Sequence, residues 1–105
     1  MAPECLGTGL ELSEREVDNR LRALADARRR ILTSYLIDKY PETVPMGGAV
    51  AHIANVTGGN YQQIEVDMVH NQIPVLEQAD LVNYTDDREL AYSGGELVIE
   101  IINLL

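Results

Sequence analysis

The chain has 105 residues, 46% of them apolar, which is enough for one hydrophobic core but not for two domains. Seventeen acidic residues against eight basic ones give a net charge of −9, the wrong sign for a protein that binds nucleic acid through phosphate contacts. No apolar run reaches the roughly 18 residues needed to cross a bilayer, and Cys5 is the only cysteine, so we expect no membrane partner, no disulfide and a cytoplasmic location.

The N-terminal part of the chain predicts a flexible arm followed by a helix. Residues 1–12 have no sustained hydrophobic period. Ser13, followed by Glu16 three positions later, forms a capping-box pattern that indicates a helix start. Apolar residues at i, i+4 and i+7 then predict one apolar helical face, made by Val17, Leu21 and Leu24.

A second helix is predicted from Asp26, which can cap it, to Tyr40, because Pro41 disfavours helical conformation in the preceding residue. Its apolar stripe consists of Ile31, Leu32, Tyr35 and Leu36. Residues 43–46 favour a short edge strand. Residues 49–56 favour a further helix, which the pair Gly58-Gly59 should end.

The next predicted helix begins at Asn60, with Gln63 in the capping-box position. Pro74 should bend or restart this helix, because an interior proline costs about 3 kcal/mol in a straight one. Its place after a glycine stop is that of the recognition helix in a winged-helix domain. Its expected core contacts are Ile64, Met68, Val69, Ile73 and Leu76.

Residues 81–85 and 89–92 are β-prone runs around Asp86-Asp87-Arg88, which predicts a hairpin. After Ser93-Gly94-Gly95, residues 96–105 are apolar almost all round. Their β-branched residues would suit a strand, but a helix after the hairpin is the more frequent arrangement and is our prediction. The predicted fold is therefore mainly α with a small β-hairpin wing: a winged helix-turn-helix over residues 13–92, with extra N-terminal and C-terminal helices, the latter in an apolar segment at 93–105.

Two stretches resemble small haloarchaeal winged-helix domains of uncharacterised function. Residues 24–32, LADARRRIL, followed by Tyr35-Leu36, look like the "L-x-x-x-R-R-R-x-x-L" opening of that family. Residues 68–82, MVHNQIPVLEQADLV, are similar to its second signature, a His-rich helix that runs into "L-P-x-L" and the wing. The resemblance covers roughly residues 17–92 and implies a dimeric, transcription-regulator-like archaeal protein without enzyme activity. This chain departs from the family in having Asp80 where a glycine is usual and Gln72 where a second histidine is usual.

The distribution of charge fits a high-salt cytoplasm. Residues 1–30 hold six arginines and six acids, whereas residues 31–105 hold only Lys39 and Arg88 against eleven acids. Dense carboxylate with almost no lysine is typical of halophilic proteins, in which molar salt screens charges over about 3 Å. An ordinary acidic mesophilic protein is the alternative. The predicted recognition segment, residues 60–82, contains no Lys or Arg but carries Glu65, Asp67, Glu77 and Asp80.

Nothing in the sequence indicates an enzyme. Cys5 has no nucleophile signature and lies far in sequence from His52 and His70. Metal-ligand spacings such as C-x-x-C and H-E-x-x-H are missing, and the glycine pairs match no phosphate-binding loop, so we predict no cofactor and no metal. His70 with Asp67 could make a casual metal contact, although a solvated polar face is the simpler interpretation. His52 is expected to pack partly buried.

DNA binding would need phosphate contacts and base contacts from a small set of polar residues. Gln and Asn can bind adenine without arginine. An arginine cluster at a helix start opposes the helix dipole, which suggests either a phosphate contact or an ion pair with Asp26, Asp38 or a partner subunit. The candidate DNA-binding residues are Arg28, Arg29, Arg30, Gln62, Gln63, His70, Asn71 and Arg88.

The sequence leaves two functions open. The first is a homodimeric, DNA-binding transcriptional regulator, and the second is an acidic winged-helix protein-protein interaction module that does not bind DNA. The apolar C-terminal segment cannot remain in water alone, so it either completes the core or pairs with a second copy. The candidate dimer-interface residues are Val17, Leu21, Leu97, Val98, Ile101, Ile102 and Leu105.

Overall fold

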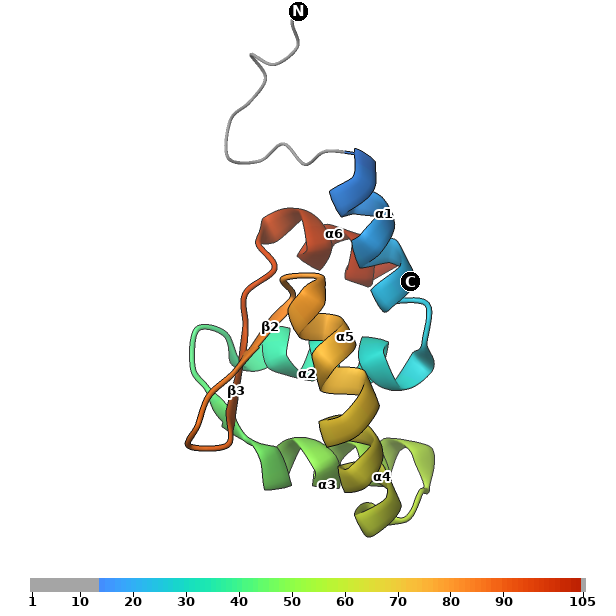
Figure 1. The fold of residues 1–105 in the computed structure, drawn as a ribbon, viewed down its shortest axis with the longest axis vertical. Coiled ribbons are helices and arrows are strands. Elements are labelled where there is room, and N and C mark those ends of the chain that lie inside the picture. Colours follow the sequence, from blue (N-terminus) through green and yellow to red (C-terminus); the bar gives the residue numbers. More distant parts are fainter. Residues whose placement is uncertain (1–13, 105) are drawn as a thin grey trace, which may run out of the picture.

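A computed structural model gives the fold and describes residues 14–104 (Figure 1). The predicted arm at residues 1–12, which includes Cys5, lies outside the described residues, and so do Ser13 and Leu105. The helices are α1 (Glu14–Ala23), α2 (Ala27–Lys39), α3 (Met46–Thr57), α4 (Tyr61–Asp67), the π-helical turn η2 (Met68–Gln72), α5 (Ile73–Gln78) and α6 (Glu96–Leu104). The strands are β1 (Val44–Pro45), β2 (Val82–Tyr84) and β3 (Glu89–Tyr92).

The caps predicted at Asp26 and Asn60 form. The Asp26 carboxylate accepts hydrogen bonds from the main-chain N–H groups of Arg28 and Arg29, and α2 therefore begins at Ala27. The helix ends at Lys39, directly before Tyr40-Pro41, as predicted. Helix α3 starts three residues before the predicted apolar pattern and ends at Gly58, whose φ of 73° is the left-handed conformation that glycine adopts without strain.

Pro74 shapes the recognition helix, which runs without a break through α4, η2 and α5. The Asn60 side chain caps its start by accepting from the N–H of Gln63 at 3.0 Å. Pro74 has no N–H, and its ring would collide with the carbonyl four residues earlier in a regular α-helix. The chain widens to a π-turn just before it, in which the N–H of Ile73 bonds to the carbonyl of Met68. The predicted bend is thus a local widening of one continuous helix.

The recognition helix ends in a Schellman motif that leads into the wing. The N–H of Leu81 bonds to the carbonyl of Leu76, and the N–H of Asp80 bonds to the carbonyl of Glu77. Asp80 has a φ of 59°, so it takes the left-handed conformation that glycine most often adopts at a helix end. Leu76 and Leu81 are both fully buried and supply the apolar contact of the motif.

The three strands form one antiparallel sheet in the order β1-β3-β2. Val44 faces Leu90, and Val82 faces Tyr92 across the two ladders. The hairpin of β2 and β3 is the predicted wing. Both predictions for this region, the hairpin and a helical rather than extended C-terminal segment, are confirmed. The result is a mainly helical fold with a small sheet and a hairpin wing, the arrangement of a winged helix-turn-helix with extra helices at both ends (Figure 1).

The core lies where α2, α3 and the recognition helix meet the sheet. Four of the five predicted contacts of the recognition helix are fully buried, and Val69 is half-buried against them. Among the described residues, no helix is long and apolar enough to cross a membrane. The largest fully buried side chains include Leu24, Leu32, Leu36, Ile53, Ile64, Met68, Ile73, Leu76, Leu81 and Leu90.

Candidate recognition face and the arginines around it

The recognition helix turns one polar side away from the core, beside the wing at residues 85–88. We call this side the recognition face. Two of its members are apolar, Val66 at 59% and Tyr61 at 40% exposure, and neither was among the residues that the sequence singled out. Val66 falls between the buried positions Ile64 and Met68, so its place off the apolar stripe was the available signal. The recognition face consists of Tyr61, Gln62, Gln63, Val66, His70 and Asn71.

Asp67, at the edge of this face, binds three side chains. Arg28 of α2 donates to its carboxylate at 2.7 Å, and Gln72 and Asn71 donate at 2.9 Å each. Burial tends to raise the pKa of Asp67, but the hydrogen bonds from Gln72, Asn71 and Arg28 outweigh it and hold the pKa below its ordinary value. The expected ion pair of the arginine cluster therefore forms with Asp67. The expected partners were Asp26, Asp38 or a second subunit, and Asp26 instead caps α2.

Arg88, in the hairpin turn, forms an ion pair with a carboxylate of the recognition helix. Its guanidinium lies 3.2 Å from the Glu65 carboxylate, and Glu65 belongs to α4. Arg88 itself has a φ of 62°, so the turn conformation of the wing aims its side chain. The remaining charged residues of the hairpin turn, Asp86 and Asp87, are acidic and exposed.

Arg29 and Arg30 bind main-chain carbonyls at the C-terminal end of α1. Arg29 donates to the carbonyls of Ala23 and Arg22, and Arg30 donates to those of Leu24 and Ala25 at 3.0 and 2.9 Å. The last carbonyls of a helix have no partner within it and carry partial negative charge. The two arginines oppose the dipole of their own helix, α2, but they donate hydrogen bonds to the unpaired carbonyls at the end of α1 and offset the partial negative charge there.

Two further arginines of α1 are also engaged within the chain. Arg20 donates to the carbonyl of Ala79, at the end of α5, and to that of Gly94 before α6. Arg22 pairs with Asp18 one turn earlier, at 2.9 Å on the exposed side of α1. Six arginines of the described part of the chain thus have partners inside the protein.

The candidate DNA-binding residues divide into two groups. Gln62, Gln63, His70 and Asn71 are all exposed on the recognition helix, although Asn71 donates to Asp67. Arg28 and Arg88 are paired with carboxylates of the recognition helix, and Arg29 and Arg30 point to the end of α1. The uncharged candidates are therefore open to solvent, whereas the arginines are turned towards the protein itself.

The candidate dimer residues of α6 lie on two sides of that helix. Val98 is fully buried in the core of its own chain, so including it in the interface was wrong. Ile102 packs beside α2 and α3. On the outer side, Leu97 and Leu104 are exposed, Leu104 at 87%, and Ile101 follows Leu97 at helical spacing but is half-buried against the core. In α1, Leu21 is exposed and Val17 half-buried, while Leu105 lies outside the described residues.

The two histidines have different surroundings. His52 is half-buried and stacks on Tyr35 with ring centroids 4.2 Å apart, as expected of a packing residue. His70 is exposed on the recognition face, and Asp67 beside it is occupied by Arg28, Asn71 and Gln72. Within residues 14–104, no group of three or more His, Cys, Asp and Glu side chains is arranged to hold a metal ion.

Comparison with known proteins gives no family assignment. No protein-family model matches the chain, and no curated protein is significantly similar to it.

Proposed function

We propose that this protein is a winged-helix protein-interaction module that acts as a homodimer at high salt and whose recognition face binds another protein rather than DNA. The observation that carries this proposal is the engagement of the arginines. Arg28 and Arg88 pair with Asp67 and Glu65 of the recognition helix, and Arg29 and Arg30 bind the end of α1. Phosphate neutralisation supplies most of the non-specific affinity of a DNA-binding protein, and the carboxylates of Asp67 and Glu65 already neutralise Arg28 and Arg88, the two arginines that contact the recognition helix through ion pairs.

The chemistry of the recognition face fits a protein partner. Val66, which is 59% exposed among polar neighbours, offers apolar area of the kind found at the centres of protein interfaces, and Tyr61, 40% exposed, adds area at the start of the helix. Asp86 and Asp87 stand at the wing beside it, so we expect the partner segment to carry Lys or Arg around an apolar contact.

Partner binding is tested by variants of the recognition face. A partner captured with the wild-type protein is identified, produced separately and titrated against purified variants. Val66→Glu should weaken binding by about tenfold or more, because it buries a carboxylate at the centre of the contact. Val56→Glu, an equally exposed valine at the end of α3, is the matched control and should bind like the wild type. Equal binding by both variants would exclude the recognition face as the contact.

DNA binding is the second candidate, and the exposed amide side chains of Gln62, Gln63 and Asn71 on the recognition helix favour it. Fluorescence polarisation with genomic and random duplexes, from low to about 2 M KCl, separates the two functions. Under our proposal no duplex binds more tightly than about 10⁻⁴ M at low salt. A genomic fragment that competes better than random DNA, with affinity lost in Gln63→Ala, would overturn it.

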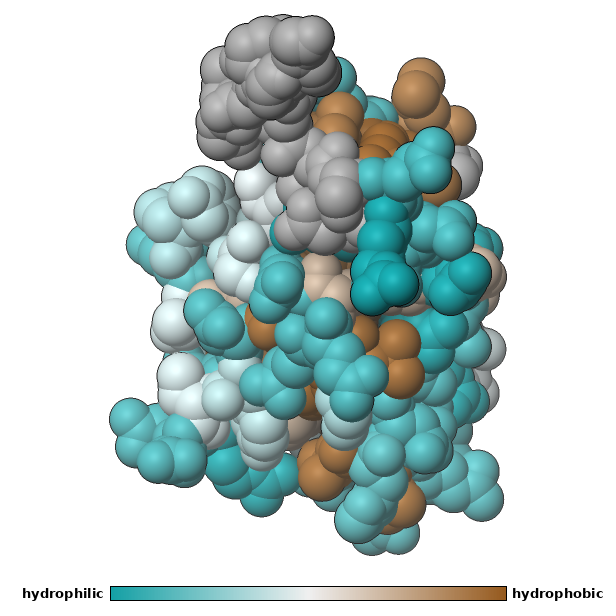
Figure 2. All heavy atoms as spheres, turned by 45° about the horizontal axis from the view of Figure 1, so that its top comes forward, coloured by the Kyte–Doolittle hydropathy of each residue, from teal (hydrophilic) through white to brown (hydrophobic). Residues whose placement is uncertain are grey.

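Self-association is supported by the outer side of α6. Figure 2 shows hydrophobic residues gathered at the end of the molecule where α1 and α6 lie. Leu97, Ile101 and Leu104 form an apolar stripe there, and Leu21 of α1 is 46% exposed. A second copy of the same helix would cover the stripe with matching apolar side chains about a two-fold axis.

The dimer is tested by light scattering at about 2 M KCl. Leu104→Asp, at the most exposed position, should give a monomer without disturbing the core. Asn103→Asp adds the same charge to an exposed neighbour on another side of α6 and should leave the dimer intact. A monomeric wild-type protein, or a dimer that survives Leu104→Asp, would contradict this interface. Deleting residues 96–105 is a poorer test, because it also removes the buried Val98.

A further inference from the structure

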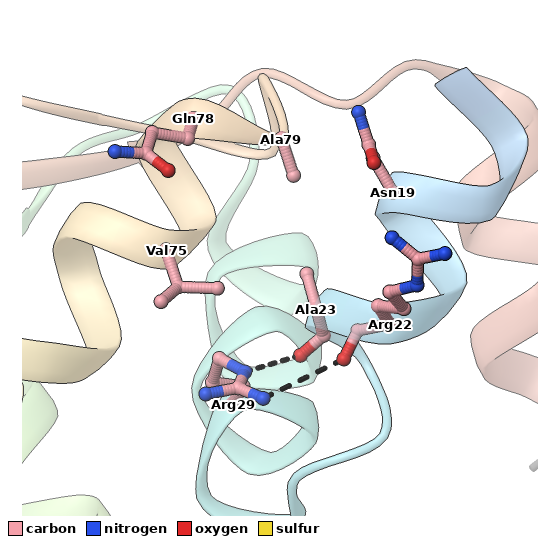
Figure 3. Close-up of a pocket in the computed structure, with 7 residues that line it drawn as sticks. All are labelled: Asn19, Arg22, Ala23, Arg29, Val75, Gln78 and Ala79. Atoms are coloured by element: carbon pink, nitrogen blue, oxygen red, sulfur yellow. Dashed lines mark hydrogen bonds between the residues drawn. The ribbon is translucent and has the colours of Figure 1, made fainter. Parts of the chain in front are cut away.

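We infer that the groove between α1 and α5 is a binding site for a small organic carboxylate. The groove has a volume of about 370 Å³, within the range of small-molecule sites. Figure 3 shows its walls: Asn19 and Arg22 lie on α1, Val75 and Gln78 on α5, and Arg29 of α2 lies at the base. Ala23 and Ala79 complete the lining. This site is separate from the recognition face, and the inference does not depend on the function proposed for that face.

The charge of the lining is opposite to that of the chain. Two of the seven lining residues are arginines, two are amides and none is acidic, although the protein as a whole carries −9. Arg22 shares its charge with Asp18, which lies outside the lining. None of the ion pairs among residues 14–104 includes Arg29. In this groove an anion would meet attraction that it would not meet over most of the surface.

Arg29 is held ready to bind. It is half-buried, and it is fixed by the carbonyls of Ala23 and Arg22 and by Oε1 of Gln72 at 2.8 Å (Figure 3). Three of its roughly five N–H groups are thus engaged by neutral acceptors, which leaves donors and the positive charge for a ligand. A guanidinium that is already oriented loses little freedom when it binds a carboxylate.

The remaining lining residues select the rest of the ligand. The side chain of Val75 points across the groove, and the methyl groups of Ala23 and Ala79 lie beside it (Figure 3). These groups favour a short apolar body attached to the anionic head. Asn19 can donate to a further oxygen atom, whereas the amide of Gln78 points away from α1 (Figure 3). Because α5 is the last part of the recognition helix, a ligand in this groove would contact both that helix and α1.

Benzoate is a suitable probe, with benzamide as its uncharged equivalent and inorganic phosphate as the competing anion. At constant ionic strength, benzoate should shift the NMR signals of the Arg29 Nε–H and the Val75 amide in a saturable way. We expect a dissociation constant of about 1 mM, and benzamide should leave both signals in place. Binding of phosphate without benzoate, or no saturable shift with benzoate, would overturn the assignment.

Two matched pairs of variants locate the site. Val75→Glu places a carboxylate in the groove and should weaken benzoate binding by about tenfold or more, whereas Val56→Glu, with the same charge on α3, should bind normally. Arg22→Gln should weaken binding, and Arg15→Gln, which lies on α1 outside the lining, should not. All four positions are exposed, so the fold is not at risk. Equal affinity within each pair would show that benzoate binds elsewhere and would refute the inference.

Discussion

The corner between α1 and α2 and the recognition helix beside the wing use charge in opposite ways. At the corner, Arg29 and Arg30 bind uncharged carbonyls, so positive charge meets helix-end dipoles and stays partly uncompensated. At the recognition helix, Asp67 and Glu65 bind Arg28 and Arg88, so both arginines there have carboxylate partners. A run of three adjacent arginines therefore does two different tasks, depending on the side of α2 from which each side chain leaves.

The difference shows why a cationic cluster in a sequence is weak evidence for nucleic-acid binding. The same residues that could meet phosphate also complete helix ends and hold neighbouring helices together. In this protein the second use accounts for Arg28, Arg29 and Arg30 without any ligand. Variants of these side chains can show how far the two regions differ.

The largest effect is expected at the corner. Arg29→Ala removes three hydrogen bonds from a half-buried charged group and leaves the carbonyl of Ala23 and the amide of Gln72 without this partner. We expect a loss of about 2–3 kcal/mol in the free energy of unfolding, measured by urea denaturation. Arg22→Ala, which breaks only an exposed pair with Asp18, should cost less than about 0.5 kcal/mol. Equal losses for the two variants would mean that the carbonyl contacts do not stabilise the fold.

The pair of Arg28 and Asp67 should have a smaller effect, because both side chains are partly exposed, at 39% and 22%. A double-mutant cycle with Arg28→Ala and Asp67→Asn should give a coupling free energy of about 0.5–1 kcal/mol. The control cycle combines Asp67→Asn with Arg15→Ala, which lies on α1, and should give no coupling. A coupling free energy near zero for the first cycle would mean that the contact between Arg28 and Asp67 does not stabilise the packing of α2 on the recognition helix.

The same carboxylate should produce an acid-sensitive part of the stability. Hydrogen bonds hold the pKa of Asp67 below its ordinary value of 3.8, so its contribution is present above that value and is lost as the pH falls through the lowered pKa of the folded state. The difference in unfolding free energy between the wild type and Asp67→Asn should therefore be constant near neutral pH and shrink in acid. A difference that stays the same at every pH would show that charge at Asp67 does not matter.

The smallest effect is expected at the wing. Arg88 and Glu65 are 3.2 Å apart but well exposed, so salt screens their attraction. Arg88→Gln should leave the urea midpoint unchanged in molar KCl and lower it slightly at low salt. In this variant, amide proton exchange should become faster only around the hairpin turn, because the hydrogen bonds between β2 and β3 remain in place. A lowered midpoint in molar KCl would mean that the wing is anchored more firmly than the geometry indicates.

The sequence by itself determined the order and ends of the elements. Asp26 and Asn60 cap their helices, and Gly58 ends α3, because these signals act between residues a few positions apart. Pro74 likewise acts on the turn just before it, although the sequence did not specify that the disturbance would be a π-turn. The hydrophobic period placed Ile64, Met68, Ile73 and Leu76 in the core for the same local reason.

Only the tertiary structure decided what the charged and exposed residues do. Arg28 meets Asp67 across 39 positions, and Arg29 meets Gln72 across 43, so no local pattern could have paired them. The packing of α6 likewise buried Val98 and left Leu97 and Leu104 outside, in a segment that is apolar almost all round. A long side chain at a helix surface can reach several neighbouring elements, and the fold alone selects which of them lies within hydrogen-bonding distance.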